Sequence, residues 1–578
     1  MARHTDGTAD TRLRWVLTGC GMVAGIAAWL LFDALPDAGI DPRAHLVLAS
    51  AAFAFFTILL ALVGPARLLP ALPYAAGTAL VLAALVWWAS LRHDTVEGFL
   101  GLGYPVAAQG LAVLIATPIA AAQLWAPGGW RDYPTLFELS WRIMVRFASA
   151  LVFVGLFWGL LALSDALLQL VQVGLMSLIR SVEPLAWLLT GGVFGLALAV
   201  VHEMRGYLSP YLVLRLLRLF VPVVLAVVVL FLALLPFRGL SGLLGALSAA
   251  GTLLSAALGA IVLVTVALDR DPVEEVHTPW LRRCVMALAL AIPLLGALAL
   301  YAIWVRVGQY GWTPARLMAV TVALVVIGYG LAYGGAVLAR TGWAARIRQA
   351  NIVMALVILA LCAVWLSPVL VPERISARSQ AARFDAGAMP AEDLPLRLLS
   401  EAWGRSGQAV LDDLRETPAV AARISDWVDG SAALDPRLTG ADLREKLAAA
   451  LPVQGADLTP DMLRSLPEDE LRRWLSACAR RVTGGPGCLL VLAEFLPGQD
   501  VRHGLLFLMD APQVLGRQAL ALRDGALTLE GYVVETAAID AAPLDPGVLE
   551  ALHRGEARIG PADHQVLRIG DRTFFPNN

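Results

Sequence analysis

The chain has 578 residues and a net charge of −2; 58% of its residues are hydrophobic and only 16% are charged. The near-neutral total hides two unlike parts, because residues 1–371 carry a net charge of +6 and residues 372–578 a net charge of −8. This division is typical of a membrane region followed by a water-soluble one, and the acidic balance of the second part argues against nucleic acid as a partner.

A polar, basic head, residues 1–14, precedes the first apolar run, residues 15–35. The run resembles a signal sequence, but it is long, lacks a convincing cleavage site and is followed by many similar runs. We therefore expect it to remain attached as the first transmembrane helix. Further transmembrane helices are predicted at 45–64, 71–91, 103–124, 143–164, 186–202, 219–237, 243–268, 284–305, 317–338 and 350–370.

The last run, residues 350–370, separates the two parts of the chain. It has no charged residue and is long enough, at about 1.5 Å per residue, to cross a hydrocarbon layer of about 30 Å. The predicted fold is therefore an α-helical polytopic membrane bundle of about 11 transmembrane helices, within residues 15–371. A soluble α+β domain is expected to follow it.

Loop arginines predict the orientation of the bundle. With the N-terminus inside, 16 arginines lie on inner loops and 6 on outer loops, as the positive-inside rule requires. Eleven crossings then place residues 372–578 outside. Because the Ala-, Gly- and Leu-rich composition with a single lysine is typical of GC-rich bacteria, we expect the bacterial inner membrane, a cytoplasmic N-terminus and a periplasmic C-terminal domain.

Residues 162–182 leave the topology open. They continue the apolar character of the fifth helix, but their uncharged core is short, as in interfacial or re-entrant helices. We expect them not to cross, because the later arginine pattern then stays consistent. A crossing here would move every later loop to the other side of the membrane.

The soluble domain is predicted in two parts. Residues 372–483 form a helical part with apolar residues at helical spacing, and residues 484–578 form a small antiparallel β part. A hairpin turn is expected at Arg523, Asp524 and Gly525. The predicted strands are 488–496, 504–509, 519–522, 527–534 and one near 566–575.

Catalytic and metal-binding signatures are weak. His202 and Glu203 begin like a zinc-protease motif, but position 206 is glycine, so the second ligand is missing. We expect neither a metal nor a cofactor. Three charged residues lie near predicted ends of transmembrane helices, where they either snorkel to the interface or form part of a proton or ion relay: Asp33, Arg146 and Asp165.

The most distinctive loop is residues 306–316. Its two arginines and two aromatic residues could bind anionic headgroups or a peptide, or the aromatic residues could simply anchor an interfacial turn. These candidate residues are Arg306, Tyr310, Trp312 and Arg316.

Two cysteines, Cys478 and Cys488, lie on either side of a Gly- and Pro-rich turn in the soluble domain. A periplasmic location would allow them to form a disulfide. The alternative is two unpaired cysteines, one of them buried as a small apolar residue.

The chain resembles the bacterial polytopic family called domain of unknown function 4153. The segments that carry the resemblance are RVGQYGWTPAR at 306–316, LMAVTVALVVIGYG at 317–330 and RISARSQ at 374–380. The resemblance implies a multi-span inner-membrane protein with no assigned activity. Some relatives have a Gly-Asp-Gly-rich turn in a periplasmic strand segment; residues 497–500, PGQD, lack that acidic repeat, so no calcium site is inferred.

These observations favour an envelope scaffold or sensor that acts through its exported domain. The alternative is a transporter or lipid-handling protein, and an enzyme ranks third because no nucleophile, base or metal set converges in sequence. The expected partners are the lipid bilayer and either envelope proteins or anionic lipids. Substrate and oligomeric state stay open.

Overall fold

The computed structural model divides into two compact units, Met1–Gln380 and Ala381–Asn578. The turn at 497–500 lies outside the residues that the structure describes. Those are residues 3–576 without 64–67, 172–173, 205–209, 244–248, 425–437, 483, 496–500, 512–513, 532, 536–545, 561–565 and 570–571.

The first unit is helical, and its described residues include 11 helices that are long and apolar enough to cross a membrane. The predicted membrane bundle is thus confirmed. These helices are α1 (Arg3–Trp29), α3 (Pro42–Leu62), α4 (Leu68–Ser90), α6 (Tyr104–Trp125), α7 (Tyr133–Gln169), α9 (Leu185–Glu203), α10 (Pro210–Leu243), α11 (Ala249–Leu268), α12 (Pro279–Tyr310), α13 (Pro314–Leu338) and α14 (Trp343–Leu366). Short helices between them are η1 (Leu30–Ala34), α2 (Leu35–Asp37), α5 (Val96–Leu100), η2 (Gly129–Arg131) and α8 (Leu175–Ser181).

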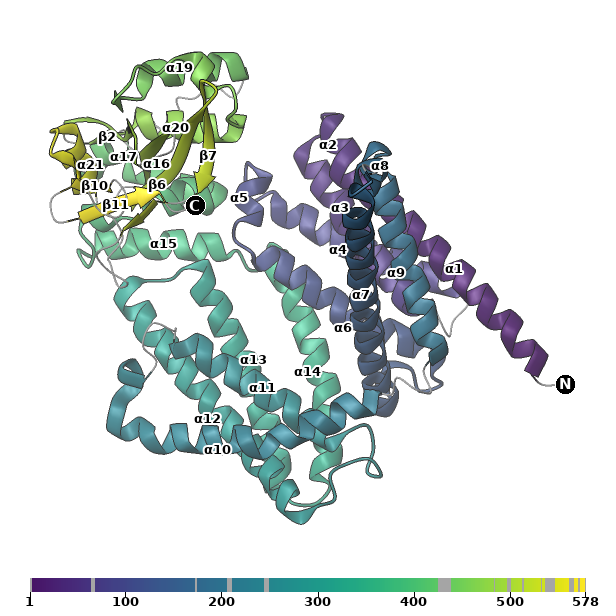
Figure 1. Ribbon diagram of the computed structural model, residues 1–578. Helices are drawn as coiled ribbons and strands as arrows, with labels where there is room; N and C mark the ends of the chain where they lie inside the picture. The colour runs from purple at the N-terminus through teal and green to yellow at the C-terminus, as the bar shows by residue number, and fades with distance from the viewer. Residues whose placement is uncertain are drawn as a thin grey trace. The chain divides into compact units, whose positions relative to one another are not determined.

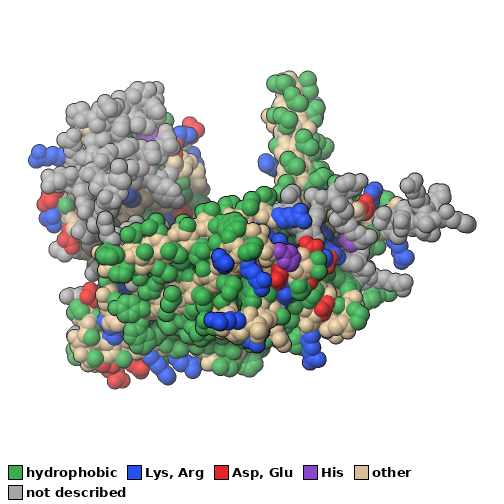
Figure 2. Space-filling view, turned by 90° about the horizontal axis from the view of Figure 1, so that it is seen from below, with side chains coloured by type: hydrophobic (Ala, Val, Ile, Leu, Met, Phe, Trp, Pro, Cys, Tyr) green, Lys and Arg blue, Asp and Glu red, His purple; other side chains and the backbone are tan. Residues whose placement is uncertain are grey.

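The helices pack around two apolar cores. One core joins α1, α3, α4, α6, α7 and α9, and the other joins α10 to α14. Helix α14 takes part in both, with Cys362 and Leu366 in the first core and Trp343 and Ile347 in the second. In Figure 1 it runs between α6 and α13. Hydrophobic side chains cover much of the face of this unit shown in Figure 2, as expected for a surface in contact with lipid.

Glycines allow a very close helix contact between α1 and α9. A Cβ atom built on Gly191 would lie 2.1 Å from the carbonyl oxygen of Gly21, and one on Gly195 would lie 2.1 Å from that of Leu17. Only residues without a side chain allow the two backbones to approach this far. The small-residue spacing in α9 therefore serves packing within the chain.

The uncertain stretch at 162–182 ends α7 and then forms α8. Helix α8 has 7 residues, which at about 1.5 Å per residue is far too short to cross a bilayer. Asp165 joins the two helices, because its carboxylate accepts hydrogen bonds from the Met176 backbone N–H (2.8 Å) and the Gln169 side chain (2.7 Å).

The start of helix α15 (Pro372–Asp385) forms buried polar contacts with the end of the membrane bundle. Its fully buried Glu373 accepts a hydrogen bond of 2.5 Å from the Tyr104 hydroxyl and lies 3.8 Å from the Arg92 guanidinium. Arg92 in turn donates to the carbonyl oxygens of Trp365 and Ser367 at the end of α14. Because these contacts hold the start of α15, the first unit extends to Gln380, beyond the residue 371 expected from hydropathy.

The second unit begins with helices. Its described helices are η4 (Ala391–Asp393), η5 (Leu398–Ala402), α16 (Gly404–Leu414), α17 (Pro418–Ile424), α19 (Gly440–Ala450), η7 (Pro460–Leu463), α20 (Glu468–Ala479) and, among the strands, α21 (Pro546–His553). A capping box between Thr439 and Asp442 starts α19. Leu443, Leu447, Leu471 and Trp474 of α19 and α20 bury their side chains in one core with the sheet.

The strands of the second unit form two larger sheets and one short two-stranded ribbon. The five-stranded sheet has the order β1-β4-β5-β6-β7, and the four-stranded sheet the order β8-β11-β10-β9. The ribbon pairs β2 (Arg481–Val482) with β3 (Gly485–Pro486). The other strands are β1 (Val453–Gln454), β4 (Cys488–Ala493), β5 (Arg502–Ala511), β6 (Val514–Arg523), β7 (Ala526–Gly531), β8 (Val533–Glu535), β9 (Ala557–Gly560), β10 (Val566–Ile569) and β11 (Arg572–Pro576).

Three details of the sheet differ from the sequence prediction. The five-stranded sheet is mixed, because β1 pairs in parallel with β4. The single strand predicted at 527–534 is divided into β7 and β8, which belong to different sheets. The last predicted strand is likewise the hairpin of β10 and β11. The β6–β7 turn is as predicted, since Asp524 and Gly525 both have positive φ between paired Arg523 and Ala526.

Candidate functional site

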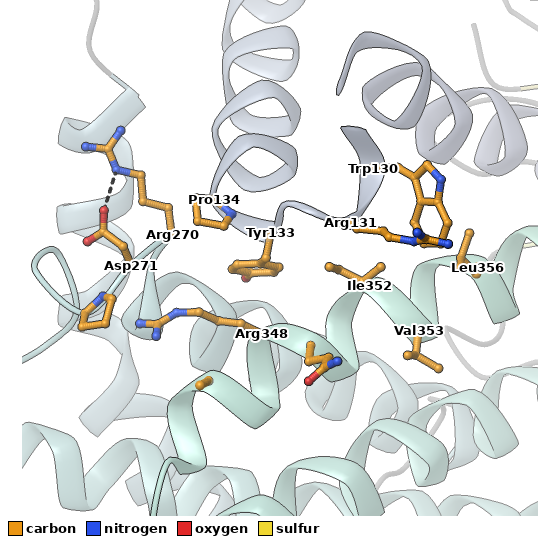
Figure 3. Close-up of a pocket in the computed structure, with 13 residues that line it drawn as sticks. Trp130, Arg131, Tyr133, Pro134, Arg270, Asp271, Arg348, Ile352, Val353 and Leu356 are labelled. Atoms are coloured by element: carbon orange, nitrogen blue, oxygen red, sulfur yellow. Dashed lines mark ion pairs between the residues drawn. The ribbon is translucent and has the colours of Figure 1, made fainter. Parts of the chain in front are cut away.

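A pocket of about 600 Å³ lies in the helical unit between the start of α7, the loop from α11 to α12, and one face of α14. Figure 3 shows it as a groove, with Tyr133 and Ile352 near its middle. The lining residues come from three distant segments: Trp130, Arg131, Tyr133 and Pro134; Arg270, Asp271 and Pro272; Ala345, Arg348, Gln349, Ile352, Val353 and Leu356. They combine three arginines and one acidic residue with an apolar strip.

One end of the pocket is polar and its charges are paired. Arg270 forms ion pairs with Asp271 (3.4 Å) and with Glu138 (3.2 Å). The buried Arg348 forms an ion pair with Glu275 (2.8 Å) and donates to the carbonyl oxygen of Leu268 (2.6 Å). These carboxylates balance the positive charge of both guanidinium groups. This end of the pocket therefore offers a ligand hydrogen-bond donors and an acceptor, without a large net charge.

A buried carboxylate supports the polar end. Asp269 is inaccessible to solvent and forms an ion pair with Arg218 of α10, while its carbonyl oxygen accepts a hydrogen bond of 3.3 Å from Arg348. Burial raises the pKa of the Asp269 carboxyl, and the backbone hydrogen bond from Arg270 and the charge of Arg218 oppose that shift. The Asp269 contacts connect α10, α11 and α14 directly behind the pocket wall.

The middle of the pocket is held by a chain of hydrogen bonds between helices. The Tyr133 hydroxyl accepts from the Asn351 amide (3.1 Å), and the Asn351 carbonyl accepts from Tyr333. Tyr333 also lies 2.9 Å from the Thr265 hydroxyl. This chain fixes the phenol ring of Tyr133 against α14, so the pocket wall is ordered by contacts within the unit.

The other end of the pocket combines a cation with apolar surface. The guanidinium of Arg131 stacks on the ring of Trp130, 5.0 Å from its centre. In Figure 3 this pair lies beside Leu356. Among the described residues, Arg131 has no acidic side chain within ion-pair distance. Val353 and Leu356 remain 54% and 37% exposed, so this end of the pocket opens onto the apolar surface of α14.

The span-end charges chosen from sequence each contact groups other than one another. Asp33 accepts a hydrogen bond of 2.7 Å from the Trp187 indole. Arg146 is buried and donates to the carbonyl oxygens of Leu60 and Val63, where it caps the end of α3. At about 1.5 Å per residue, Arg146 and Asp165 are separated by roughly 28 Å along α7. The structure shows no hydrogen bond or ion pair between any two of these three described residues.

The loop at 306–316 packs on α15. The guanidinium carbons of Arg306 and Arg316 both lie over the Tyr310 ring, 5.8 and 5.6 Å from its centre. The backbone N–H of Trp312 donates to the Ser379 hydroxyl (3.1 Å), and the Gln380 side-chain amide donates to the carbonyl oxygens of Tyr310 and Trp312. Two of the segments that carry the family resemblance thus contact each other, and the loop has many structural contacts.

Cys478 of α20 and Cys488 of β4 form a disulfide in the structure, with Cα atoms 4.8 Å apart. Cys20, Cys284 and Cys362 are unpaired. Among the described residues, no group of three or more His, Cys, Asp or Glu side chains is placed to hold a metal ion.

The family model described as Domain of unknown function (DUF4153) matches residues 22–413. The chain belongs to the DUF4153 family. No curated protein and no solved structure matches the chain. The match covers most of the membrane bundle, the pocket and the 306–316 loop, so these are features of the DUF4153 region, while the strands of the second unit lie beyond it.

The pocket residues of this DUF4153 protein were not singled out from sequence. In the sequence, Arg131, Arg270 and Arg348 contribute only to the loop charge that orients the helices, and Trp130 is one of many aromatic residues near span ends. A usable signal exists in α14, where Ala345, Arg348, Ile352 and Leu356 recur at helical spacing and place an arginine on the same face as an apolar strip.

Proposed function

We propose that this DUF4153 protein is a lipid-handling membrane protein that binds an anionic amphiphile in the pocket between α7 and α14. The observation that carries the proposal is the lining itself, which joins three guanidinium groups to an exposed apolar strip within the membrane bundle. Ligand sites are concave, largely apolar and supplied with a few placed polar groups, and a volume of about 600 Å³ lies within their usual range.

Lipid extraction tests this proposal. Protein purified in a mild nonionic detergent should retain a bound amphiphile, and Ile352→Trp should remove it by filling the middle of the pocket. Leu331→Trp is the matched control, because Leu331 is 65% exposed on α13 and does not line the pocket. Equal lipid retention by the wild type and by Ile352→Trp, at equal thermal stability, would exclude the pocket as the binding site.

We also propose that the protein lies in a bacterial inner membrane with its N-terminus in the cytoplasm and its C-terminal unit in the periplasm, where that unit serves as a scaffold or sensor. The loop arginines support this orientation. The Cys478–Cys488 disulfide supports it independently, because disulfides persist in oxidising compartments and are rare in the cytosol.

Thiol labelling in intact cells tests the orientation. In a variant with Cys20→Ser, Cys284→Ser and Cys362→Ala, only the pair in the second unit remains. Both sulfurs are buried, so the pair should be alkylated only after reduction of the unfolded protein; alkylation without reduction would argue against the bond. The side of the membrane is reported by an added cysteine at the exposed Asp413, Asp413→Cys, which a reagent that enters the periplasm but does not cross the inner membrane should label in intact cells. Labelling of this added cysteine only after cell lysis would place the unit in the cytoplasm.

A further inference from the structure

The pocket between α7 and α14 has two chemically different ends, and this difference indicates how a ligand is oriented. We infer that the ligand is a phospholipid whose phosphate contacts Arg131. This inference rests on the amphiphile site proposed above. Its polar headgroup enters the pocket, and one acyl chain lies along α14.

The pairing of the three lining arginines indicates that the phosphate binds at Arg131. Arg270 and Arg348 already face carboxylates, whereas Arg131 has no ion-pair partner among the described residues. Its neighbour Asp132 is not within ion-pair distance of it and accepts a hydrogen bond from the Thr135 hydroxyl instead. A guanidinium presents a planar set of donors that matches phosphate oxygens, and stacking on Trp130 holds that plane in position.

The start of α14 supplies free backbone N–H donors at the opposite, polar end of the pocket, where Arg348 lies. Its N-cap is Gly342, which has no side chain to cap the free N–H groups of the first turn, and Ala345 in that turn lines the pocket. The lone carboxylate in the lining, Asp271, is paired with Arg270. The pocket therefore favours a single negative charge at Arg131 and polar, hydrogen-bonding groups near Asp271 and Arg348.

The exposed apolar side chains of α14 indicate where the acyl chain lies. At the Arg131 end of the pocket, α14 presents Val353 (54% exposed) and Leu356 (37%), and Val357 (40%) follows them outside the lining. These positions follow helical spacing into the transmembrane part of α14, so they form an apolar strip that leads from the pocket into the bilayer core. The pocket volume suits a headgroup rather than a whole two-chain lipid, and this strip is the place for a chain.

Binding measured by native mass spectrometry tests the inference. The full chain in a nonionic detergent is titrated with phosphatidylglycerol, with oleate, which has a carboxylate in place of the phosphate, and with inorganic phosphate. We expect phosphatidylglycerol to bind best and Arg131→Gln to weaken it about tenfold, as for loss of a charged hydrogen bond. Millimolar inorganic phosphate should not displace it, because it lacks a chain.

Arg282→Gln is the matched control, because Arg282 is also an exposed arginine stacked on a tryptophan, 5.4 Å from the ring centre of Trp343, and lies outside the pocket lining. It should leave affinity unchanged within about twofold, and Arg131→Lys should retain only part of it.

The outcomes separate this inference from the proposed function. Equal affinity for oleate and phosphatidylglycerol, or equal losses in Arg131→Gln and Arg282→Gln, would overturn the phosphate assignment while leaving an amphiphile site. Displacement by inorganic phosphate would replace the lipid with the free anion. If Ile352→Trp left the binding of every probe unchanged, both the inference and the proposed function would fall.

Discussion

Gly191→Leu is expected to prevent normal assembly of the helical unit. A Cβ atom at this position would meet the backbone of Gly21 at 2.1 Å, and a backbone atom cannot move aside as a flexible side chain can. Helices α1 and α9 would have to separate along their whole contact. We expect a total loss of about 4 kcal/mol or more, above the roughly 1–3 kcal/mol typical of overpacked cores. Size-exclusion chromatography and thermal unfolding in detergent measure the loss.

The control for this variant is Gly155→Leu. Gly155 lies in α7, and a Cβ atom there would have no heavy atom within 4 Å. It should therefore behave like the wild type. If Gly191→Leu also gave normal yield and normal melting temperature, the close packing of α1 on α9 would be wrong.

Arg92→Leu is expected to destabilise the helical unit by about 3–5 kcal/mol, the usual result of removing one partner of a buried ion pair. The substitution removes the hydrogen bonds to Tyr104, Trp365 and Ser367. Among the described residues, the fully buried Glu373 side chain then keeps the Tyr104 hydroxyl as its one partner. Because Arg92 holds the end of α14 and the start of α15, unfolding should begin at this junction. Chemical denaturation in detergent gives the change in free energy.

The double variant Arg92→Leu/Glu373→Gln should recover part of this loss, because it removes the buried charge that the single variant leaves without a cation. Arg374→Leu provides the control, since Arg374 is exposed on the same turn of α15. A loss in Arg374→Leu as large as that in Arg92→Leu would show that the buried network is not the cause.

The membrane bundle could be predicted because long uncharged runs have one stable structure in a bilayer. Each crossing helix satisfies its own backbone hydrogen bonds, so its existence depends on local composition alone. The second unit was harder, since strand pairing is not local. No local pattern assigns β1 to a parallel partner more than 30 residues away or separates β7 from β8, which are adjacent in sequence but lie in different sheets.

The pocket could not be predicted for a related reason. Its walls come from η2 and the start of α7, from the loop after α11, and from α14, and these segments meet only when the two apolar cores pack against α14. Asp33, Arg146 and Asp165 were chosen from sequence because charges near a membrane are costly. In the structure they contact an indole, the end of α3 and the start of α8. Local hydrogen bonds therefore offset the free-energy cost of these charges.

The most direct measurement of the central claim is a cryo-electron microscopy map of the full chain in nanodiscs that contain phosphatidylglycerol. We predict elongated density that begins at the Arg131 side chain and continues over Val353 and Leu356, with a bulge toward Asp271 for the headgroup. A map of equal quality in which surrounding lipids are visible, but the space between Tyr133 and Ile352 is empty or filled by the protein's own side chains, would contradict the account.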